Sequence, residues 1–323
     1  MAGEPTALSA TRTIALPGRG AGLMAYLDLG PNDRKVDAVF LHANGFNALT
    51  YRHVLAGLAR RYRILAIDQR GHGRTSLEAD VNQRRDWLDL RDDLLAFLVA
   101  LDLAHIVLAG HSMGATVSLL AAVDEPRRCR NLVLFDPVMP PPLPWTGSSE
   151  PGLIEITRRR RAIFPSRADA FESYRGRGAF KTWPEPMLAD YVEAGFQDLP
   201  DGEVTLACAP NWEASGYAAQ EHDSWDALAR SSSPVHILKA ETASTFRPNG
   251  SCEELGDRVH LTTVAGTSHF LPMERADIVQ TALTDALETP VCTKGWLEGQ
   301  PRRDPNSEER LIGGTERNYL PRG

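Results

Sequence analysis

The order of apolar segments restricts the fold of this chain more than any other feature of its sequence. Short runs rich in Val, Ile and Leu alternate with helix-like segments, and such runs are typical of strands covered on both faces. The strand-like runs cover residues 36–43, 62–69, 105–112, 131–137, 235–240 and 260–266. The helix-like segments cover residues 48–60, 84–101, 115–122 and 276–287. With an antiparallel pair over 13–17 and 23–30, the pattern predicts a doubly wound α/β fold whose mostly parallel, eight-stranded sheet has helices on both faces.

The alternation stops between Val138 and Ser233, over a stretch too long for a loop in a compact domain. Helical fragments inside it predict a helical cap over residues 139–232, inserted into a core made of residues 1–138 and 233–289. We expect most aromatic residues of the cap to pack against one another and some to line a ligand site. These are Trp145, Phe171, Tyr174, Phe180, Trp183, Tyr191 and Trp212. The tail, residues 290–323, loses apolar periodicity and is predicted to be disordered.

The overall composition excludes several classes of protein. The chain has 323 residues, 42% hydrophobic and 24% charged, which is ordinary for a globular protein with a large core. Its net charge of -7 and pI near 5.7 argue against a nucleic-acid-binding protein, which would carry a basic face. The one basic run, residues 158–161, is interpreted as the solvated face of a helix.

The start of the chain and its cysteines bear on location and metal chemistry. No secretory signal is visible, and no apolar run approaches the length of a membrane span, so we expect a cytoplasmic protein. Cys129, Cys208, Cys252 and Cys292 are far apart and form no CxxC pair, which predicts neither a zinc site nor a disulfide framework. The sequence does not determine the oligomeric state.

The segment AGHSMG, residues 109–114, directly follows a strand-like run and precedes a helix-like one. A sharp turn there would expose the hydroxyl of Ser112, while Gly110 and Gly114 avoid side-chain collisions around it. The dipole of the following helix favours a nucleophile or an oxyanion at this place. GxSxG alone is a weak signal, but its position between strand and helix favours Ser112 as a nucleophile.

A serine hydroxyl attacks only when a base takes its proton. His269, in GTSHFLPME, follows the last strand-like run and precedes the last helix, at the same edge of the predicted sheet. We prefer it as the base over a structural role in the core.

The segment FLHANGF, residues 40–46, ends a strand-like run in small residues that let a substrate approach the backbone. A tetrahedral intermediate needs N–H donors for its oxyanion. We assign these to Met113 and Asn44, with Phe46 as the less favoured choice, and expect His42 to brace the loop.

These motifs, together with DQRGHGRTS at residues 68–76, resemble those of the α/β-hydrolase fold superfamily. The likeness covers about residues 20–138 and 233–288, and the four motifs stand in the family's order. It implies a serine-nucleophile member with a helical cap and without a metal or cofactor. Asp68, Arg70 and Gly73 then organise their loop rather than react. A serine at the elbow argues against epoxide hydrolases and haloalkane dehalogenases, which use an aspartate there.

The acid that orients the histidine is the open question. Family members commonly place it three residues after a glycine, as in GxxD, but here Ala240 and Ala243 stand at these positions. Asp136, which ends the strand-like run after the elbow, is preferred because the carboxyl ends of parallel strands meet at one crevice. Glu241 is the alternative.

The resemblance implies a hydrolase that cleaves an ester-like carbonyl of a small molecule through an acyl-enzyme on Ser112, and a carboxylesterase is preferred. Other acyl chemistry on the same triad stays open: a lactonase, a carbon–carbon bond hydrolase, a thioesterase, a peptidase or an acyltransferase. A different class is a non-catalytic ligand receptor on the same scaffold.

Overall fold

The computed structural model describes residues 9–82, 84–140, 151–248 and 256–289. All of them belong to one compact unit that ends at Thr289. The tail that the sequence predicts to be disordered, residues 290–323, lies outside the described residues.

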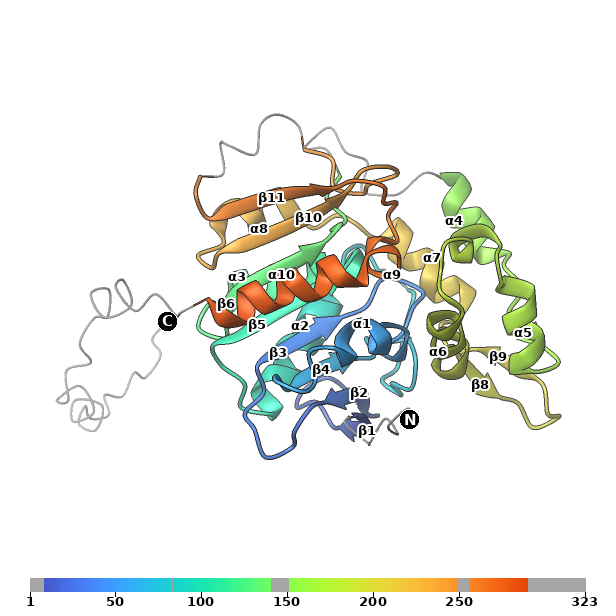
Figure 1. Ribbon diagram of the computed structural model, residues 1–323. Helices are drawn as coiled ribbons and strands as arrows, with labels where there is room; N and C mark the ends of the chain where they lie inside the picture. Colours follow the sequence, from blue (N-terminus) through green and yellow to red (C-terminus); the bar gives the residue numbers. More distant parts are fainter. Residues whose placement is uncertain (1–8, 83, 141–150, 249–255, 290–323) are drawn as a thin grey trace, which may run out of the picture. The chain divides into compact units, whose positions relative to one another are not determined.

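An eight-stranded sheet forms the centre of this unit (Figure 1). Its strands, in order across the sheet, are β1 (Ser9–Ile14), β2 (Met24–Leu29), β4 (Ile64–Ile67), β3 (Ala38–Leu41), β5 (Ile106–His111), β6 (Cys129–Phe135), β10 (Val235–Ala240) and β11 (Val259–Val264). β1 pairs with β2, and β2 with β4, in antiparallel register, and all other neighbours are parallel. The predicted mostly parallel, eight-stranded sheet is confirmed.

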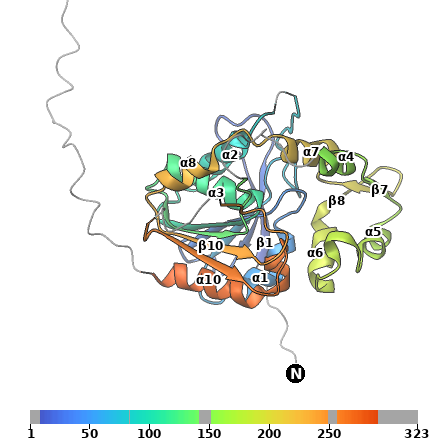
Figure 2. The ribbon, with the colours of Figure 1, turned by 90° about the horizontal axis from the view of Figure 1, so that it is seen from above.

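Helices cover both faces of the sheet (Figure 2). One face carries α2 (Leu88–Ala100), α3 (Met113–Asp124) and α8 (Ser224–Arg230), and the other carries α1 (Arg52–Ala56) and α10 (Ala276–Glu288). The short helices η1 (Leu49–Tyr51) and α9 (Leu271–Glu274) precede α1 and α10.

Side chains alternate along each strand between the two hydrophobic clusters of the core. In β3, Phe40 packs into one cluster, whereas Val39 and Leu41 pack into the other. In β5, Val107 and Leu108 divide in the same way. Because both faces are covered at the centre of the sheet, β3, β4 and β5 are almost entirely apolar, which explains the continuous runs in the sequence.

The chain between β6 and α8 builds a separate layer beside the carboxyl ends of the strands (Figures 1 and 2). Its helices are α4 (Pro151–Arg158), α5 (Arg167–Tyr174), η2 (Gly178–Phe180), α6 (Glu185–Gly195) and α7 (Pro210–Ala218). It also holds a small antiparallel sheet in the order β7 (Ile163–Phe164), β9 (Val204–Leu206) and β8 (Phe196–Asp198). The helix α8 falls inside the predicted insertion, yet it packs against α3 of the core.

The aromatic residues of this layer mostly contact one another. Tyr191 lies in edge or tilted contact with Tyr174, Phe180 and Trp183. These rings join the same hydrophobic cluster as one face of the central sheet. Trp145 lies outside the described residues.

The basic run at residues 158–161 differs in part from its interpretation as a solvated face. Arg159 is largely exposed, but Arg160 turns inward and pairs with the buried carboxylate of Glu213. Its guanidinium also donates to the hydroxyls of Tyr174 and Tyr191, at 3.2 and 3.3 Å. A buried carboxylate requires a paired cation, so one arginine of the run has a structural role.

Candidate active site

The turn between β5 and α3 holds Ser112 in a conformation that few non-glycine residues adopt. Its φ is 56° and its ψ is -120°. A Cβ on Gly114 would lie 2.4 Å from the carbonyl oxygen of Leu41, and one on Gly110 would lie 2.5 Å from the backbone of Gly114. Both glycines are therefore needed for the strand, the turn and the helix to pack together.

The structure brings Ser112, His269 and Asp136 together. The Ser112 Oγ lies 3.0 Å from His269 Nε2, and His269 Nδ1 lies 2.6 Å from Asp136 Oδ2. Because an ionised carboxylate only accepts hydrogen bonds, Nδ1 carries the proton and Nε2 is free to accept the proton of the serine. This is the geometry of a nucleophile, a base and an orienting acid.

Asp136 is fully buried at the end of β6. Ala240 N–H and Ser244 Oγ–H donate to its Oδ1 at 2.9 and 2.6 Å, and Thr245 N–H donates to its Oδ2 at 3.0 Å. Burial opposes ionisation, but the hydrogen bond and charge of His269, followed by the donors of Ser244 and Thr245, hold the pKa of this carboxyl below its usual value.

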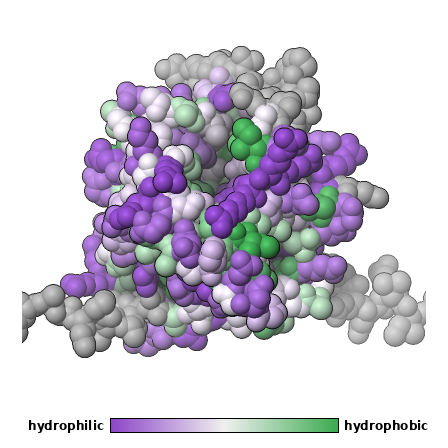
Figure 3. Space-filling view, turned by 90° about the vertical axis from the view of Figure 1, so that its right-hand side faces the viewer, coloured by the Kyte–Doolittle hydropathy of each residue, from purple (hydrophilic) through white to green (hydrophobic). Residues whose placement is uncertain are grey.

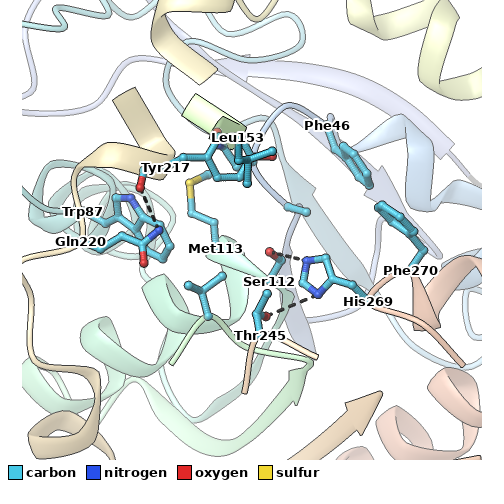
Figure 4. Close-up of a pocket in the computed structure, with 13 residues that line it drawn as sticks. Phe46, Trp87, Ser112, Met113, Leu153, Tyr217, Gln220, Thr245, His269 and Phe270 are labelled. Carbon is cyan, nitrogen blue, oxygen red and sulfur yellow. Dashed lines mark hydrogen bonds between the residues drawn. The ribbon is translucent and has the colours of Figure 1, made fainter. Parts of the chain in front are cut away.

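The alternative acid, Glu241, lies elsewhere. Its side chain is exposed and accepts a hydrogen bond from the N–H of Gly266 at 2.8 Å. Ala243, at the position where family members commonly carry the acid, is exposed with a φ of 50°. The residue of this loop that approaches His269 is Thr245, whose Oγ1 lies 3.4 Å from Nδ1 (Figure 4). Sequence reasoning missed Ser244 and Thr245, and no motif marks them.

The loop after β3 leaves a backbone N–H without an acceptor among the described residues. Ala43 N–H donates to the Tyr51 hydroxyl, Gly45 N–H to His72 Nε2 and Phe46 N–H to the Ala43 carbonyl. In the part of the chain that the structure describes, the N–H of Asn44 has no such acceptor. This favours Asn44 over Phe46 as an oxyanion donor. Met113 begins α3, so its N–H has no acceptor in a preceding helical turn.

Two neutral histidines brace this loop. His42 Nδ1–H donates to the Ala43 carbonyl at 2.8 Å, and its Nε2 accepts from Gln69 N–H at 2.9 Å. His72 Nδ1–H donates to the Arg70 carbonyl at 2.9 Å. Burial lowers the pKa of His42 to about 4 and the pKa of His72 well below its usual value, so both stay uncharged near neutral pH.

A third histidine connects the two loops that flank the nucleophile, and sequence reasoning did not single it out. His111 Nε2–H donates to the carbonyl of His269 at 2.7 Å, while its Nδ1 accepts from the hydroxyl of Tyr51 at 2.7 Å. The Tyr51 oxygen accepts in turn from Ala43 N–H at 3.2 Å. Burial and the neighbouring His269 lower the pKa of His111 to about 3, which keeps this connection neutral.

A mainly apolar cavity of about 240 Å³ opens above Ser112. Figure 4 shows Trp87, Tyr217 and Gln220 on one side of the serine, and Phe46 and Phe270 on the other. Its remaining lining residues are Ala43, Asn44, Met113, Val138, Leu153, Thr245 and His269. The predicted aromatic residues of the insertion that the structure describes do not line it.

The insertion side of the molecule carries hydrophobic side chains in the middle of a largely hydrophilic surface (Figure 3). Leu153, which lines the cavity, is exposed, as are Ile156 and Ile163. The described residues contain no group of three or more His, Cys, Asp or Glu placed to hold a metal ion. None of the described helices is long and apolar enough to cross a membrane.

Comparison with known proteins identifies the family. A sequence model described as the Alpha/beta hydrolase family matches residues 38–281. The chain belongs to this family. The predictions of an alpha/beta hydrolase fold and of a hydrolytic enzyme are thereby confirmed.

Individual proteins show more distant similarity. The 2-(acetamidomethylene)succinate hydrolase of Mesorhizobium japonicum is 22% identical over 252 residues, which are 77% of this chain and 87% of that protein. A crystal structure of E-2-(acetamidomethylene)succinate hydrolase matches with a TM-score of 0.69 at 20% identity, over 87% of this chain and all of that one. The N-formylmaleamic acid deformylase of Pseudomonas putida S16 matches with a TM-score of 0.62 at 18% identity, over 85% of this chain and all of that one. At these identities the two structures establish the fold.

Proposed function

We propose that this alpha/beta hydrolase is a serine hydrolase that cleaves a small carboxylic ester through an acyl-enzyme. One observation carries the proposal: Ser112, His269 and Asp136 form a continuous hydrogen-bonded chain, with separations of 3.0 and 2.6 Å, at the floor of an apolar cavity. Such a chain activates a hydroxyl that is otherwise a poor nucleophile.

In the proposed reaction, Ser112 Oγ attacks the ester carbonyl and His269 Nε2 takes its proton. Asp136 keeps the proton of His269 on Nδ1 and stabilises the imidazolium that forms. The N–H groups of Asn44 and Met113 donate to the oxyanion of the tetrahedral intermediate. His269 then protonates the leaving alcohol, and water attacks the acyl-enzyme in the same way to release the acid.

The position of the base indicates how the substrate lies. Because His269 must protonate the leaving oxygen, the alcohol group is placed on its side, against the rings of Phe46 and Phe270. The acyl group then extends toward Met113, Trp87 and Tyr217 on the other side (Figure 4). Sites for drug-sized ligands usually measure about 300–1,000 Å³, and a cavity of about 240 Å³ therefore favours a short acyl chain.

The lining of the cavity also favours an uncharged substrate. No Lys or Arg is found among the lining residues within the described ranges. Two relatives carry names of acidic compounds, a substituted succinate and a maleamic acid. A cation that would pair with such a carboxylate is missing from the described wall, so we propose a neutral ester rather than an acidic amide.

Labelling with a fluorophosphonate probe tests the enzyme directly. We expect the wild type to be labelled and Ser112→Ala to remain unlabelled. Ser118→Ala is the matched control, since this buried serine of α3 donates to the Gly114 carbonyl at 2.8 Å and is absent from the cavity wall. Labelling that persists in Ser112→Ala contradicts the assignment of Ser112 as the nucleophile. An unlabelled wild type contradicts the mechanism and favours a non-catalytic ligand receptor.

A substrate panel tests the class of compound. We expect p-nitrophenyl acetate and butyrate to be hydrolysed with higher kcat/KM than the decanoate. Faster turnover of thioesters, lactones or amides of dicarboxylic acids than of any ester would replace the carboxylesterase proposal by that chemistry.

A further inference from the structure

The last residue of β10 and two residues of the loop after it hold the carboxylate of Asp136 by hydrogen bonds. Ala240 N–H and the hydroxyl of Ser244 donate to Oδ1, at 2.9 and 2.6 Å, and Thr245 N–H donates to Oδ2 at 3.0 Å. The remaining partner of the carboxylate, at 2.6 Å, is His269. A buried carboxylate without such donors would be strongly destabilised.

The backbone of this loop explains how two adjacent residues reach the same carboxylate. Ala243 adopts a φ of 50°, which reverses the chain after the end of β10. Asp136 itself, directly after β6, has a φ of 42°. Met139 and Phe246 form an isolated parallel bridge a few residues beyond these two positions, which holds the two segments side by side.

Thr245 holds the most central position in the loop. Its hydroxyl lies 2.9 Å from the carbonyl of Asp136, 3.3 Å from Asp136 Oδ2 and 3.4 Å from His269 Nδ1. It also lines the cavity, whereas Ser244 does not. Ser244 therefore contacts Asp136 away from the cavity, and its Oγ also accepts from Phe246 N–H at 3.1 Å, whereas Thr245 contacts the acid, the base and the cavity.

We propose that Ser244 and Thr245 are positioning residues. The loop after β10, where family members commonly carry the acid, holds Asp136 at the end of the neighbouring strand β6 in place. This inference rests on the proposed serine-hydrolase function. The Ser244 hydroxyl and the N–H groups of Ala240 and Thr245 fix the carboxylate so that Oδ2 faces His269 Nδ1, which keeps Nε2 available to Ser112. The Thr245 hydroxyl, whose shortest contact is the Asp136 carbonyl at 2.9 Å, holds the backbone of the acid. With fewer donors, the negative charge of Asp136 is less stabilised and attracts the imidazolium more strongly.

Ser244→Ala removes one donor and leaves the cavity wall intact. We expect kcat to fall about tenfold with KM unchanged, because a hydrogen bond to a charged group is lost outside the substrate site. We also expect the acidic limb of the pH profile of kcat/KM to move upward by about half a pH unit. Ser244→Thr keeps a hydroxyl and should restore both values.

Thr242→Ala is the matched control in the same loop. The hydroxyl of Thr242 donates to the Thr267 carbonyl at 3.0 Å rather than to Asp136. If the loop had only a structural role, Thr242→Ala and Ser244→Ala would have the same effect on activity. We expect Thr242→Ala to leave the pH profile unchanged, and an equal shift in both variants would overturn the proposal. Circular dichroism and thermal melting verify the fold of each variant.

A second pair of variants tests Thr245. Thr245→Ser keeps the hydroxyl, whereas Thr245→Val replaces it with a methyl group of similar size. We expect the serine variant to keep the wild-type pH profile and the valine variant to shift it upward. Identical profiles in the two variants would remove Thr245 from the proposal.

Proton NMR of the whole protein separates this inference from the proposed function. The proton of the 2.6 Å hydrogen bond between His269 and Asp136 should give a far-downfield resonance that Asp136→Asn abolishes. We expect Ser244→Ala to move this resonance and Thr242→Ala to leave it in place. A resonance unmoved by Ser244→Ala refutes the positioning role even if hydrolysis is observed. A moved resonance without ester hydrolysis upholds the positioning and refutes the function.

Discussion

Replacing Asp136 by asparagine tests the assignment of the acid. The carboxylate accepts from Ala240 N–H on Oδ1 and from Thr245 N–H on Oδ2, and His269 Nδ1–H also donates to Oδ2. An amide has a single acceptor oxygen. In either orientation of the substituted side chain, the NH₂ group of the amide therefore faces a backbone N–H at about 3 Å, where no hydrogen bond can form.

The magnitude of the effect follows from these two orientations. With the amide oxygen near Ala240, the NH₂ group faces His269 and drives the imidazole proton to Nε2, so the base can no longer accept from Ser112. With the oxygen near His269, the proton stays on Nδ1, but the negative charge that stabilises the imidazolium is lost. We expect kcat to fall by about 10³- to 10⁴-fold, which corresponds to about 4–5.5 kcal/mol of transition-state stabilisation.

The control is Glu241→Gln. Glu241 accepts from Gly266 N–H at 2.8 Å, and the oxygen of a glutamine can accept the same bond. We expect kcat within about twofold of wild type and a stability change below about 0.5 kcal/mol. Steady-state hydrolysis of p-nitrophenyl acetate measures both variants, with circular dichroism to verify folding. A folded Asp136→Asn enzyme that keeps a tenth of wild-type kcat, or a Glu241→Gln enzyme that loses as much as Asp136→Asn does, would refute the assignment.

Three further predictions concern stability. Burial raises the pKa of Asp68 to about 6, above its ordinary 3.8, so the folded state binds more protons between these values and stability falls as pH rises through 6. Urea unfolding should show the wild type gaining about 1 kcal/mol relative to Asp68→Asn between pH 7 and 5, and equal pH dependence of the two would contradict this. Gly45→Ala should lower stability by at least about 2 kcal/mol and abolish ester hydrolysis, because φ is 75° and the new Cβ would lie 2.5 Å from Glu213 Oε1. Arg160→Met should cost about 3–5 kcal/mol by leaving the carboxylate of Glu213 buried without its cation, and adding Glu213→Gln should recover most of that loss; no recovery would mean that the pair is not coupled.

The sequence predicts the central fold well because both faces of the sheet are covered. The central strands then appear as continuous apolar runs, as in β4 and β5. The insertion is predicted less well. The strands β7, β8 and β9 have only two or three residues each, which is too short for an alternating pattern to be visible. Likewise, nothing in a run of four arginines marks Arg160 as the one that turns inward.

In the candidate site, too, some residues could be predicted from the sequence and others could not. Ser112 and His269 stand in local motifs, so their positions follow from the order of strands and helices, and their roles in catalysis stay predictions for the experiments above to test. The sequence could not decide between Asp136 and Glu241 as the acid, because the backbone of one loop determines which carboxylate reaches His269. The positive φ values of Asp136 and Ala243 direct the chain there, and neither residue is a glycine that would reveal it.

The helix α7 limits how the active site can open. Asn44 Nδ2 donates to the carbonyl of Glu213, Trp87 Nε1 donates to the carbonyl of Gly216, and Trp212 Nε1 donates to the carbonyl of Arg70. The side chain of Asn44 also packs so closely on Gly216 that a Cβ there would lie 2.7 Å from it. A hinge movement that lifted the whole insertion would break these bonds and distort the loop after β3 that carries Asn44. We therefore expect α7 to stay docked during substrate entry, which predicts slow hydrogen exchange of its amides.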